Sequence, residues 1–373
     1  MKAATHYLGC TGWLLFLLLF GGIDSSVAQN RDEFERAQAI AKKKRAGEII
    51  SSGEAALMGK YVERGWISDM DPNRTSTGLI PLSDLGPSGN YKGEDGGLYG
   101  KGRNEPEPKH QAIIDQVLTK VVPRDSTGAP DSSGKIVLIS VGMSNTSREF
   151  GPFIRIANTD ARKSPAVAIV NCAQGSRAAL QWVEKEDVWE GIGKNLDRSQ
   201  LTKNQVQVAW VKLTEMGPSK YGDFPAHTDF FEGNLVKIIH RLKTTCPNLS
   251  VIYFTSRVYA GYAVGERGLN PEPYAYEGAF AMRRLILKQL NGDRELNFDP
   301  AKGEVKAPLL LWGPYLWCDG MMPRSDGLVW PPELLDFDGV HPSEAGKAKI
   351  ASLLLEFFAT DRNAKPWFTG ERD

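Results

Sequence analysis

The chain has 373 residues, and 41% of them are hydrophobic, which suffices for one large domain or for a domain with an appendage. Its 45 Lys and Arg residues balance 45 Asp and Glu residues, so the formal net charge is zero. This balance argues against nucleic acid or an anionic membrane surface as the main partner, because both attract an excess of positive charge.

Residues 1–28 have the pattern of a secretory signal sequence. Lys2 gives a weakly positive start, residues 13–20 form an apolar run, and the small residues at 26–28 precede Gln29. The apolar run is shorter than the roughly 20 residues that a membrane span needs. We therefore expect cleavage before Gln29 and a secreted or periplasmic protein with no stable membrane span after cleavage. An uncleaved anchor is the alternative.

Residues 29–134 are expected to form an N-terminal extension, which contains helices and loops rich in Gly and Pro. Apolar residues recur at helical spacing within 31–64, and residues 109–121 resemble a short helix. Between them, residues 66–108 are dominated by Gly, Pro, Asn and Asp, which favour irregular structure. The sequence alone assigns no role to this extension.

A regular alternation of strands and helices begins at residue 135 and defines a second region, residues 135–373. Apolar runs of strand length occur at 136–141, 166–170, 206–211, 251–255 and 309–312. Helical patterns follow most of them, at 176–190, 233–245, 275–291 and 343–360. Strands that alternate with helices predict an α/β fold, in which a parallel five-stranded sheet is covered on both faces. Continuously apolar strands agree with a sheet buried on both sides.

Three residues in this second region suggest nucleophilic catalysis. Ser144 follows the first predicted strand, where open α/β sheets place reactive side chains. Asp338 and His341 are three residues apart, so one turn of chain can bring their side chains together. A serine hydroxyl needs an imidazole to accept its proton, and the imidazole needs a carboxylate to fix its tautomer. Ser176 is an alternative nucleophile without such partners.

Two short motifs of residues 135–360 resemble the SGNH (GDSL-like) hydrolase superfamily. Gly142-Met143-Ser144 is similar to the Gly-Asp-Ser block of that family, with Met143 in place of Asp, and Asp338-Gly-Val-His341 is similar to its terminal Asp-x-x-His block. The resemblance implies a flavodoxin-like three-layer sandwich. It also implies a hydrolase of the esterase, lipase or carbohydrate deacetylase kind, with Ser144 as nucleophile, His341 as base and Asp338 as the group that orients it.

The resemblance also implies how an oxyanion is stabilised. The N–H groups of Gly175 and of the nucleophile itself stand where the family donates hydrogen bonds to the oxyanion. The family's third donor, an asparagine after the third strand, is missing, and Lys212 ends that strand here. We expect the Lys212 side chain to donate instead, with Asn145 as a second candidate. A surface lysine at a strand end is the open alternative.

Four residues after the later strands are candidates for substrate binding, namely Arg257, Tyr259, Tyr315 and Trp317. Aromatic faces suit sugar rings and an arginine suits a carboxylate or sulfate, whereas ordinary packing is the alternative. We therefore expect a secreted serine esterase whose substrate is a small-molecule or polysaccharide ester, such as an acetylated carbohydrate. A non-catalytic carbohydrate-binding protein on the same scaffold and a lipase-like acylhydrolase remain alternatives.

No cofactor or metal is expected, because the sequence has no H-E-x-x-H motif and no closely spaced Cys or His pairs. Cleavage of the signal would leave Cys172, Cys246 and Cys318. Their odd number allows at most one disulfide within the chain, and we expect three buried thiols.

Overall fold

The structure is a computed structural model that describes residues 25–45, 48–63, 67, 69–264, 270–336 and 338–371. The apolar run that predicts a signal sequence lies outside these residues. The chain divides into two compact units, Met1–Tyr61 and Val62–Asp373. None of the described helices has both the length and the apolar character that crossing a membrane requires.

The first unit contains α1 (Ser25–Arg45) and most of α2 (Ser52–Glu63), where the sequence predicts helical structure. The two helices contact each other through the rings of Phe34 and Tyr61, whose centroids are 5.5 Å apart. Lys60 and Glu33 form an ion pair beside these rings at 2.6 Å.

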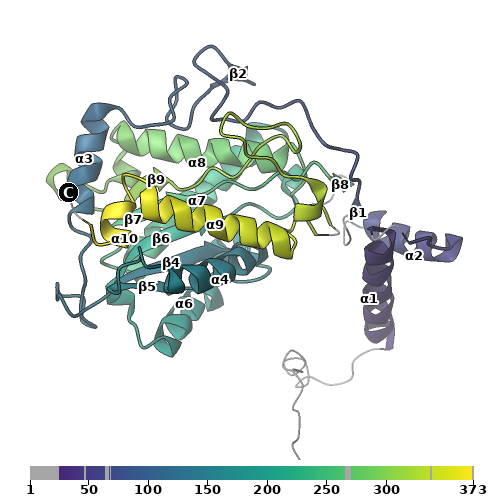
Figure 1. Ribbon diagram of the computed structural model, residues 1–373, viewed down its shortest axis with the longest axis horizontal. Helices are drawn as coiled ribbons and strands as arrows, with labels where there is room; N and C mark the ends of the chain where they lie inside the picture. The colour runs from purple at the N-terminus through teal and green to yellow at the C-terminus, as the bar shows by residue number, and fades with distance from the viewer. Residues whose placement is uncertain are drawn as a thin grey trace, which may run out of the picture. The chain divides into compact units, whose positions relative to one another are not determined.

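The second unit is built on a five-stranded parallel sheet, as the sequence predicts (Figure 1). Its strands are β4 (Ile136–Gly142), β5 (Val167–Val170), β6 (Val206–Lys212), β7 (Val251–Phe254) and β9 (Leu309–Trp312). All lie within one residue of the predicted runs. Their spatial order is β5-β4-β6-β7-β9. Numbered along the chain this is 2-1-3-4-5, which is the flavodoxin-like order.

Helices cover both faces of this sheet and give three layers (Figure 1). On one face, α4 (Ser144–Thr159) packs beside α9 (Glu344–Thr360). Trp210 of β6 stacks on Phe150 of α4 with ring centroids 5.2 Å apart, and Tyr253 of β7 contacts Phe358 of α9. The other helices of the unit are α3 (Pro108–Leu118), α5 (Ala179–Glu184), α6 (Asp187–Arg198), α7 (Ala226–Thr245), α8 (Tyr274–Leu290) and α10 (Lys365–Phe368).

Two helical predictions need correction. The sequence predicts one helix over 176–190, but α5 and α6 are separate, and a short non-helical link joins them. The helix α4 is absent from the predicted elements, although it spans 16 residues. Its sequence includes Gly151 and Pro152, which disfavour helices in isolation, and its apolar face is stabilised by packing on the sheet and α9.

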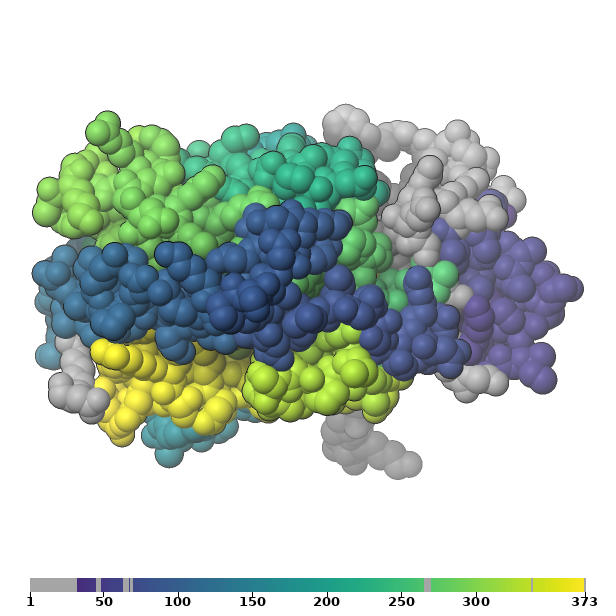
Figure 2. Space-filling view, turned by 90° about the horizontal axis from the view of Figure 1, so that it is seen from above, coloured from purple at the N-terminus to yellow at the C-terminus, as the bar shows by residue number. Residues whose placement is uncertain are grey.

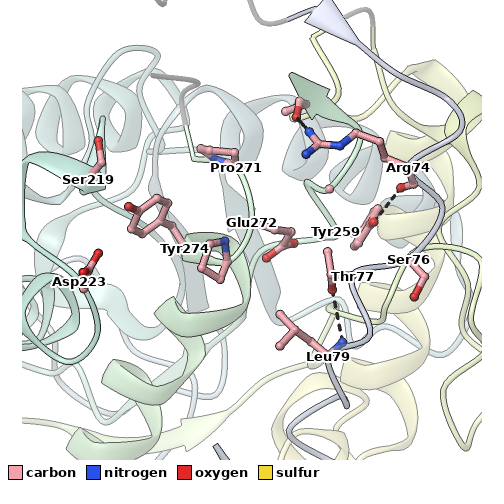
Figure 3. A pocket seen from close by; sticks show the side chains of 13 residues that line it. Arg74, Ser76, Thr77, Leu79, Ser219, Asp223, Tyr259, Pro271, Glu272 and Tyr274 are labelled. Atoms are coloured by element: carbon pink, nitrogen blue, oxygen red, sulfur yellow. Dashed lines mark hydrogen bonds between the residues drawn. The ribbon is translucent and has the colours of Figure 1, made fainter. Parts of the chain in front are cut away.

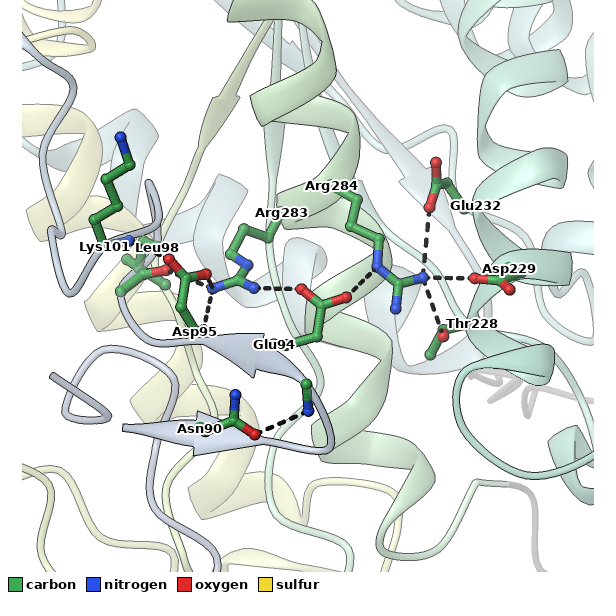
Figure 4. Close-up of polar contacts among 12 residues, drawn as sticks. Asn90, Glu94, Asp95, Leu98, Lys101, Thr228, Asp229, Glu232, Arg283 and Arg284 are labelled. Carbon is green, nitrogen blue, oxygen red and sulfur yellow. Dashed lines mark hydrogen bonds and ion pairs between the residues drawn. The ribbon is translucent and has the colours of Figure 1, made fainter. Parts of the chain in front are cut away.

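Residues 69–134 pack on the sheet domain as part of the second unit, while the sequence places a domain boundary at 134. Figure 2 shows this segment, in dark blue, running across the surface between α8 and the C-terminal helices. It carries a hairpin of β2 (Asn90–Tyr91) and β3 (Glu94–Asp95), and its strand β1 (Asp69–Met70) pairs with β8 (Ala263–Val264). The hairpin is held by Arg283 and Arg284 of α8 (Figure 4).

The described cysteines agree with the prediction of buried thiols. Cys172, Cys246 and Cys318 are all buried and free of disulfides. Burial raises the pKa of each thiol, to about 12 for Cys246 and Cys318, so all three remain protonated near neutral pH.

Candidate active site

Ser144 lies at the point where β4 ends and α4 begins, and Gly142 makes this sharp transition possible. A Cβ on Gly142 would lie 2.2 Å from Thr146 Oγ1 and 2.5 Å from the Lys212 carbonyl oxygen, so only glycine fits. Thr146 Oγ1 donates to that same carbonyl at 2.6 Å and ties the first turn of α4 to β6. The hydroxyl of Ser144 therefore sits at a helix N-terminus, where the peptide dipoles favour negative charge.

The structure brings Ser144, His341 and Asp338 together across 197 positions of sequence. Ser144 Oγ is 2.9 Å from His341 Nε2, and His341 Nδ1 is 2.5 Å from Asp338 Oδ2. Asp338 Oδ1 also accepts hydrogen bonds from the backbone N–H groups of Val340 (2.9 Å) and His341 (2.8 Å). The carboxylate thus fixes both the ring and the backbone of the histidine.

The environment of Asp338 keeps it ionised. Burial by itself raises the pKa of this carboxyl, but hydrogen bonds from the His341 ring and from two backbone N–H groups outweigh burial and hold the pKa below its ordinary value. An ionised Asp338 accepts a hydrogen bond from the protonated Nδ1 of His341, which leaves Nε2 unprotonated as the acceptor that faces Ser144. This tautomer is the one that can remove the serine proton.

Two predicted site residues support the loop that carries His341. Asn145 is fully buried, and its Nδ2 donates to the Val340 carbonyl oxygen at 3.1 Å, so its amide links the nucleophile segment to the histidine loop. Arg257, predicted to bind substrate, is 3% exposed, and its Nη2 lies 3.5 Å from the same carbonyl. Burial lowers the pKa of Arg257, while Glu149 and Asp338 oppose this effect. Neither side chain has the exposure that a direct contact with substrate requires.

The predicted oxyanion donor Gly175 lies in the loop after β5, next to a residue that is bonded to the end of β4. The neighbouring Gln174 N–H donates to the Gly142 carbonyl at 3.0 Å, which fixes this loop beside the end of β4. Gly175 is exposed. Within the described part of the chain, no group accepts a hydrogen bond from the N–H of Gly175 or of Ser144. Both donors are therefore available to a ligand at Ser144.

The prediction that Lys212 donates to an oxyanion is not supported by its position. Its ammonium is bound by both carboxylate oxygens of Glu149, at 2.6 and 2.7 Å, and neither side chain is exposed. Lys212 points toward α4 from the same face of β6 as Trp210, between the sheet and the helix. Burial lowers the pKa of the Lys212 amine, whereas Glu149 opposes that shift. A lysine enclosed in this way cannot reach a substrate carbonyl.

Two of the aromatic residues predicted to bind substrate are internal. The Tyr315 hydroxyl accepts a hydrogen bond from the Leu82 N–H at 3.1 Å, which anchors the N-terminal segment. Trp317 is fully buried, and its Nε1 donates to Glu272 at 2.8 Å. The alternative stated for these residues, ordinary aromatic packing, describes both.

A cavity of about 960 Å³ lies in the second unit (Figure 3), and the described residues that line it do not include Ser144, Asp338 or His341. Tyr259, the remaining predicted residue, contributes to its lining but is fully buried, and its hydroxyl donates to the Arg74 carbonyl at 2.7 Å. Ala263 is also in the wall and lies close to Gly339. A Cβ added to Gly339 would lie only 2.7 Å from Ala263 N. Gly339 has a φ of +66° and lies between Asp338 and His341 in the chain, so the cavity wall and the triad loop share a backbone contact.

Most of the cavity wall was not identified from the sequence. Glu272 and Tyr274 come from the segment before α8, while Arg74 and Thr77 come from the N-terminal extension. The only available signal was the Pro- and Tyr-rich stretch 271–276. The described residues contain no cluster of three or more His, Cys, Asp or Glu side chains that could bind a metal ion.

Comparisons with known proteins give no family for this chain, because no family model and no curated protein matches it. Similar solved structures include a protein from Arabidopsis thaliana, at 15% identity and a TM-score of 0.30, which covers 57% of this chain and 67% of that chain. Another is the psychrotrophic esterase EstA from Pseudoalteromonas sp., at 13% identity and a TM-score of 0.32, which covers 60% of this chain and 96% of that chain.

A third is a gut microbial diltiazem-metabolizing enzyme, at 13% identity and a TM-score of 0.32, which covers 60% of this chain and 46% of that chain. Likenesses this distant carry no argument about activity. The function is therefore inferred from the geometry of the site.

Proposed function

We propose that this protein is a secreted serine hydrolase of the SGNH kind that cleaves carboxylic esters. The observation that carries the proposal is the continuous chain of contacts from Ser144 Oγ through the His341 ring to Asp338. Such a chain of contacts activates a serine for attack on an acyl carbon.

In the proposed reaction, Ser144 Oγ attacks the ester carbonyl while His341 Nε2 accepts the serine proton. The carbonyl oxygen becomes an oxyanion that accepts hydrogen bonds from the N–H of Ser144, at the start of α4, and from the N–H of Gly175, in the loop after β5. His341 then donates the proton to the leaving alcohol, and an acyl-serine remains. Water, deprotonated by His341, attacks this intermediate and releases the acid. Asp338 stays ionised throughout and stabilises the protonated imidazole.

The acyl group is proposed to be small, such as acetyl. A short acyl chain fits a nucleophile flanked by buried residues, since Met143, Asn145 and Thr146 are all nearly or fully buried. The polar wall of the cavity in the second unit supports a polar alcohol portion, such as a carbohydrate, rather than the long acyl chain of a lipase substrate.

Replacement of Ser144 tests this proposal. Ser144→Ala is expected to reduce hydrolysis of 4-nitrophenyl acetate by at least about 10³-fold and to abolish labelling by a fluorophosphonate, because the nucleophile is lost. Ser147→Ala, one turn further along α4, is the matched control and should retain both. Unchanged hydrolysis in Ser144→Ala would overturn the proposal.

One observation favours a second candidate function, a non-catalytic carbohydrate-binding protein. Lys212 is bound by Glu149, so no third side-chain donor for the oxyanion has been identified, and loss of one such donor costs about 10²–10³ in kcat. A folded protein that binds acetylated oligosaccharide but is not labelled at Ser144 by the fluorophosphonate would support this alternative.

A further inference from the structure

The cavity whose wall contacts the triad loop at Gly339 has a partly buried carboxylate, Glu272, that the proposed reaction does not use. Glu272 Oε1 accepts hydrogen bonds from the Ala260 N–H (2.9 Å) and from Trp317 Nε1 (2.8 Å), and its Oε2 accepts one from the Tyr276 N–H (3.0 Å). A carboxylate has about four acceptor positions. Three are filled, so one position on Oε2 remains for a ligand. In Figure 3 this side chain lies between Tyr274 and Tyr259 in the middle of the cavity.

The opposite rim of the cavity is fixed and also presents acceptors. The carboxylate of Asp319 is contacted by the hydroxyls of Ser76 and Thr77 and by the N–H groups of Thr77 (2.7 Å) and Gly78 (2.9 Å). Both hydroxyls donate their proton to Asp319 and already accept one backbone N–H each, from Gly78 and Leu79, so one lone pair on each oxygen is left for a ligand. The rim is therefore a rigid set of acceptors rather than donors.

The described part of the cavity lining carries one basic side chain, Arg74, and two acidic ones, Asp223 and Glu272, so it has no excess of several like charges. Arg74 lies at one end, where its Nη1 donates to the Ala263 carbonyl at 2.7 Å, and Asp223 lies at the other (Figure 3). A wall that offers several acceptors beside the partly exposed ring of Tyr274 matches a neutral ligand that has several hydroxyl donors and an apolar ring face.

We propose that this cavity binds the alcohol portion of the ester that Ser144 attacks, and that this portion is a hydroxyl-rich ring such as a sugar. Glu272 determines specificity by accepting a hydrogen bond from one hydroxyl of that ring. The inference rests on the proposed function, because it assigns the alcohol side of the same reaction. The contact between Ala263 and Gly339 places the cavity wall against the loop of the triad.

The protonation of Glu272 gives this inference a pH signature. Burial raises its pKa to about 7, and the negative charge of Asp319 acts in the same direction. Among the described residues, the other charged or titratable groups that interact with it are Arg257, Tyr91, Tyr259, Tyr276 and Tyr315. Above about pH 7 the carboxylate is ionised and accepts a hydrogen bond, whereas below this pH its free position carries a proton. KM for a sugar ester should therefore rise as the pH falls through about 7.

The test compares three acetyl esters on the full chain: a partially acetylated xylo-oligosaccharide, 4-nitrophenyl acetate and acetylcholine. Glu272→Gln is expected to raise KM for the oligosaccharide about tenfold, since it removes a charge-assisted hydrogen bond, and to abolish the rise of that KM below pH 7. For 4-nitrophenyl acetate, kcat/KM should change less than about twofold, because that ester makes no such hydrogen bond.

Glutamine places an amide N–H against the Tyr276 N–H, so a second pair of variants guards against misfolding. Ser219→Trp adds bulk at the exposed rim of the cavity and should raise KM for the oligosaccharide only. Lys220→Trp, its neighbour outside the cavity lining, is the control and should leave all three esters unaffected.

The outcomes separate the two proposals. Equal effects of Glu272→Gln and Ser219→Trp on all esters, or a preference for acetylcholine that depends on Glu272, would overturn the sugar subsite while the esterase stands. If none of the three esters is hydrolysed in a way that depends on Ser144, both the esterase proposal and the sugar-subsite proposal are overturned.

Discussion

Two groups of charged side chains in the second unit differ in how they are stabilised. Beneath the proposed catalytic centre, Glu149 and Lys212 form an ion pair in which neither side chain is exposed. On the outer side of α8, Glu94 of the hairpin lies between Arg283 and Arg284, and it is 23% exposed (Figure 4). The first group is a closed pair, and the second is a shared, partly hydrated network.

The difference lies in how many partners each charge has. Both oxygens of Glu149 bind the Lys212 ammonium, so removal of either partner leaves a charge without water. Arg283 instead donates to the Asp95 and Gly97 carbonyls and also pairs with the Asp95 carboxylate at 3.0 Å. A buried ion pair is costly to break even though its net contribution to stability is small. In a network where each charge has several partners, the loss of one contact leaves the other contacts in place.

The largest expected effect therefore comes from breaking the closed pair. Lys212→Met should lower the free energy of unfolding by about 3–5 kcal/mol, because Glu149 would lose its ion-pair partner and keep only the electrostatic attraction of the buried Arg257. Urea denaturation measures this loss. Because Glu149 belongs to the helix that begins with Ser144, ester hydrolysis should also fall.

The double variant Lys212→Met/Glu149→Leu is the matched control. It removes both charges and keeps apolar volume, so most of the stability should return. If the double variant were as unstable as the single one, shape at this site rather than unpaired charge would explain the loss, and the contrast with the hairpin network would be wrong.

The wrong prediction for Lys212 shows which features the sequence can predict and which it cannot. The strands and their parallel arrangement can be predicted from apolar runs in the sequence. The triad can be predicted from residue types that depend on one another chemically, namely Ser144, His341 and Asp338. These signals are local or pairwise, and the sheet brings the ends of its strands to one edge whatever the loops do.

Contacts between layers have no such signal. In the sequence, Glu149 looks like an ordinary polar residue of α4. It contacts Lys212 only because Lys212 pairs with Gly142 in the sheet, which brings the two side chains together. Likewise, Trp317 follows a strand end, where function is common, but its loop folds inward onto Glu272. The cavity combines residues near 75 with residues near 272, and no spacing rule connects these two segments.

Breaking the shared network should have a smaller effect. Glu94→Gln should cost about 1–2 kcal/mol, since Arg283 keeps the Asp95 contacts and Arg284 keeps its ion pair with Asp229 at 2.6 Å. Hydrogen exchange should accelerate at residues 90–95, while 4-nitrophenyl acetate hydrolysis should be unchanged. A loss as large as that of Lys212→Met would show that the hairpin carries stability for the whole unit.

The smallest effect is expected where a pair is both isolated and hydrated. Lys194 and Glu190 are one turn apart on α6 at 3.1 Å, and their side chains are 66% and 59% exposed. Lys194→Gln keeps a good helix former and should change the free energy of unfolding by less than about 0.5 kcal/mol. Urea denaturation with and without about 0.5 M salt should give the same small value, because screening already weakens such a pair. A decrease in the free energy of unfolding above about 1 kcal/mol would contradict this expectation. It would show that exposure to water does not reduce the cost of losing a charge in this protein beyond what the number of partners sets.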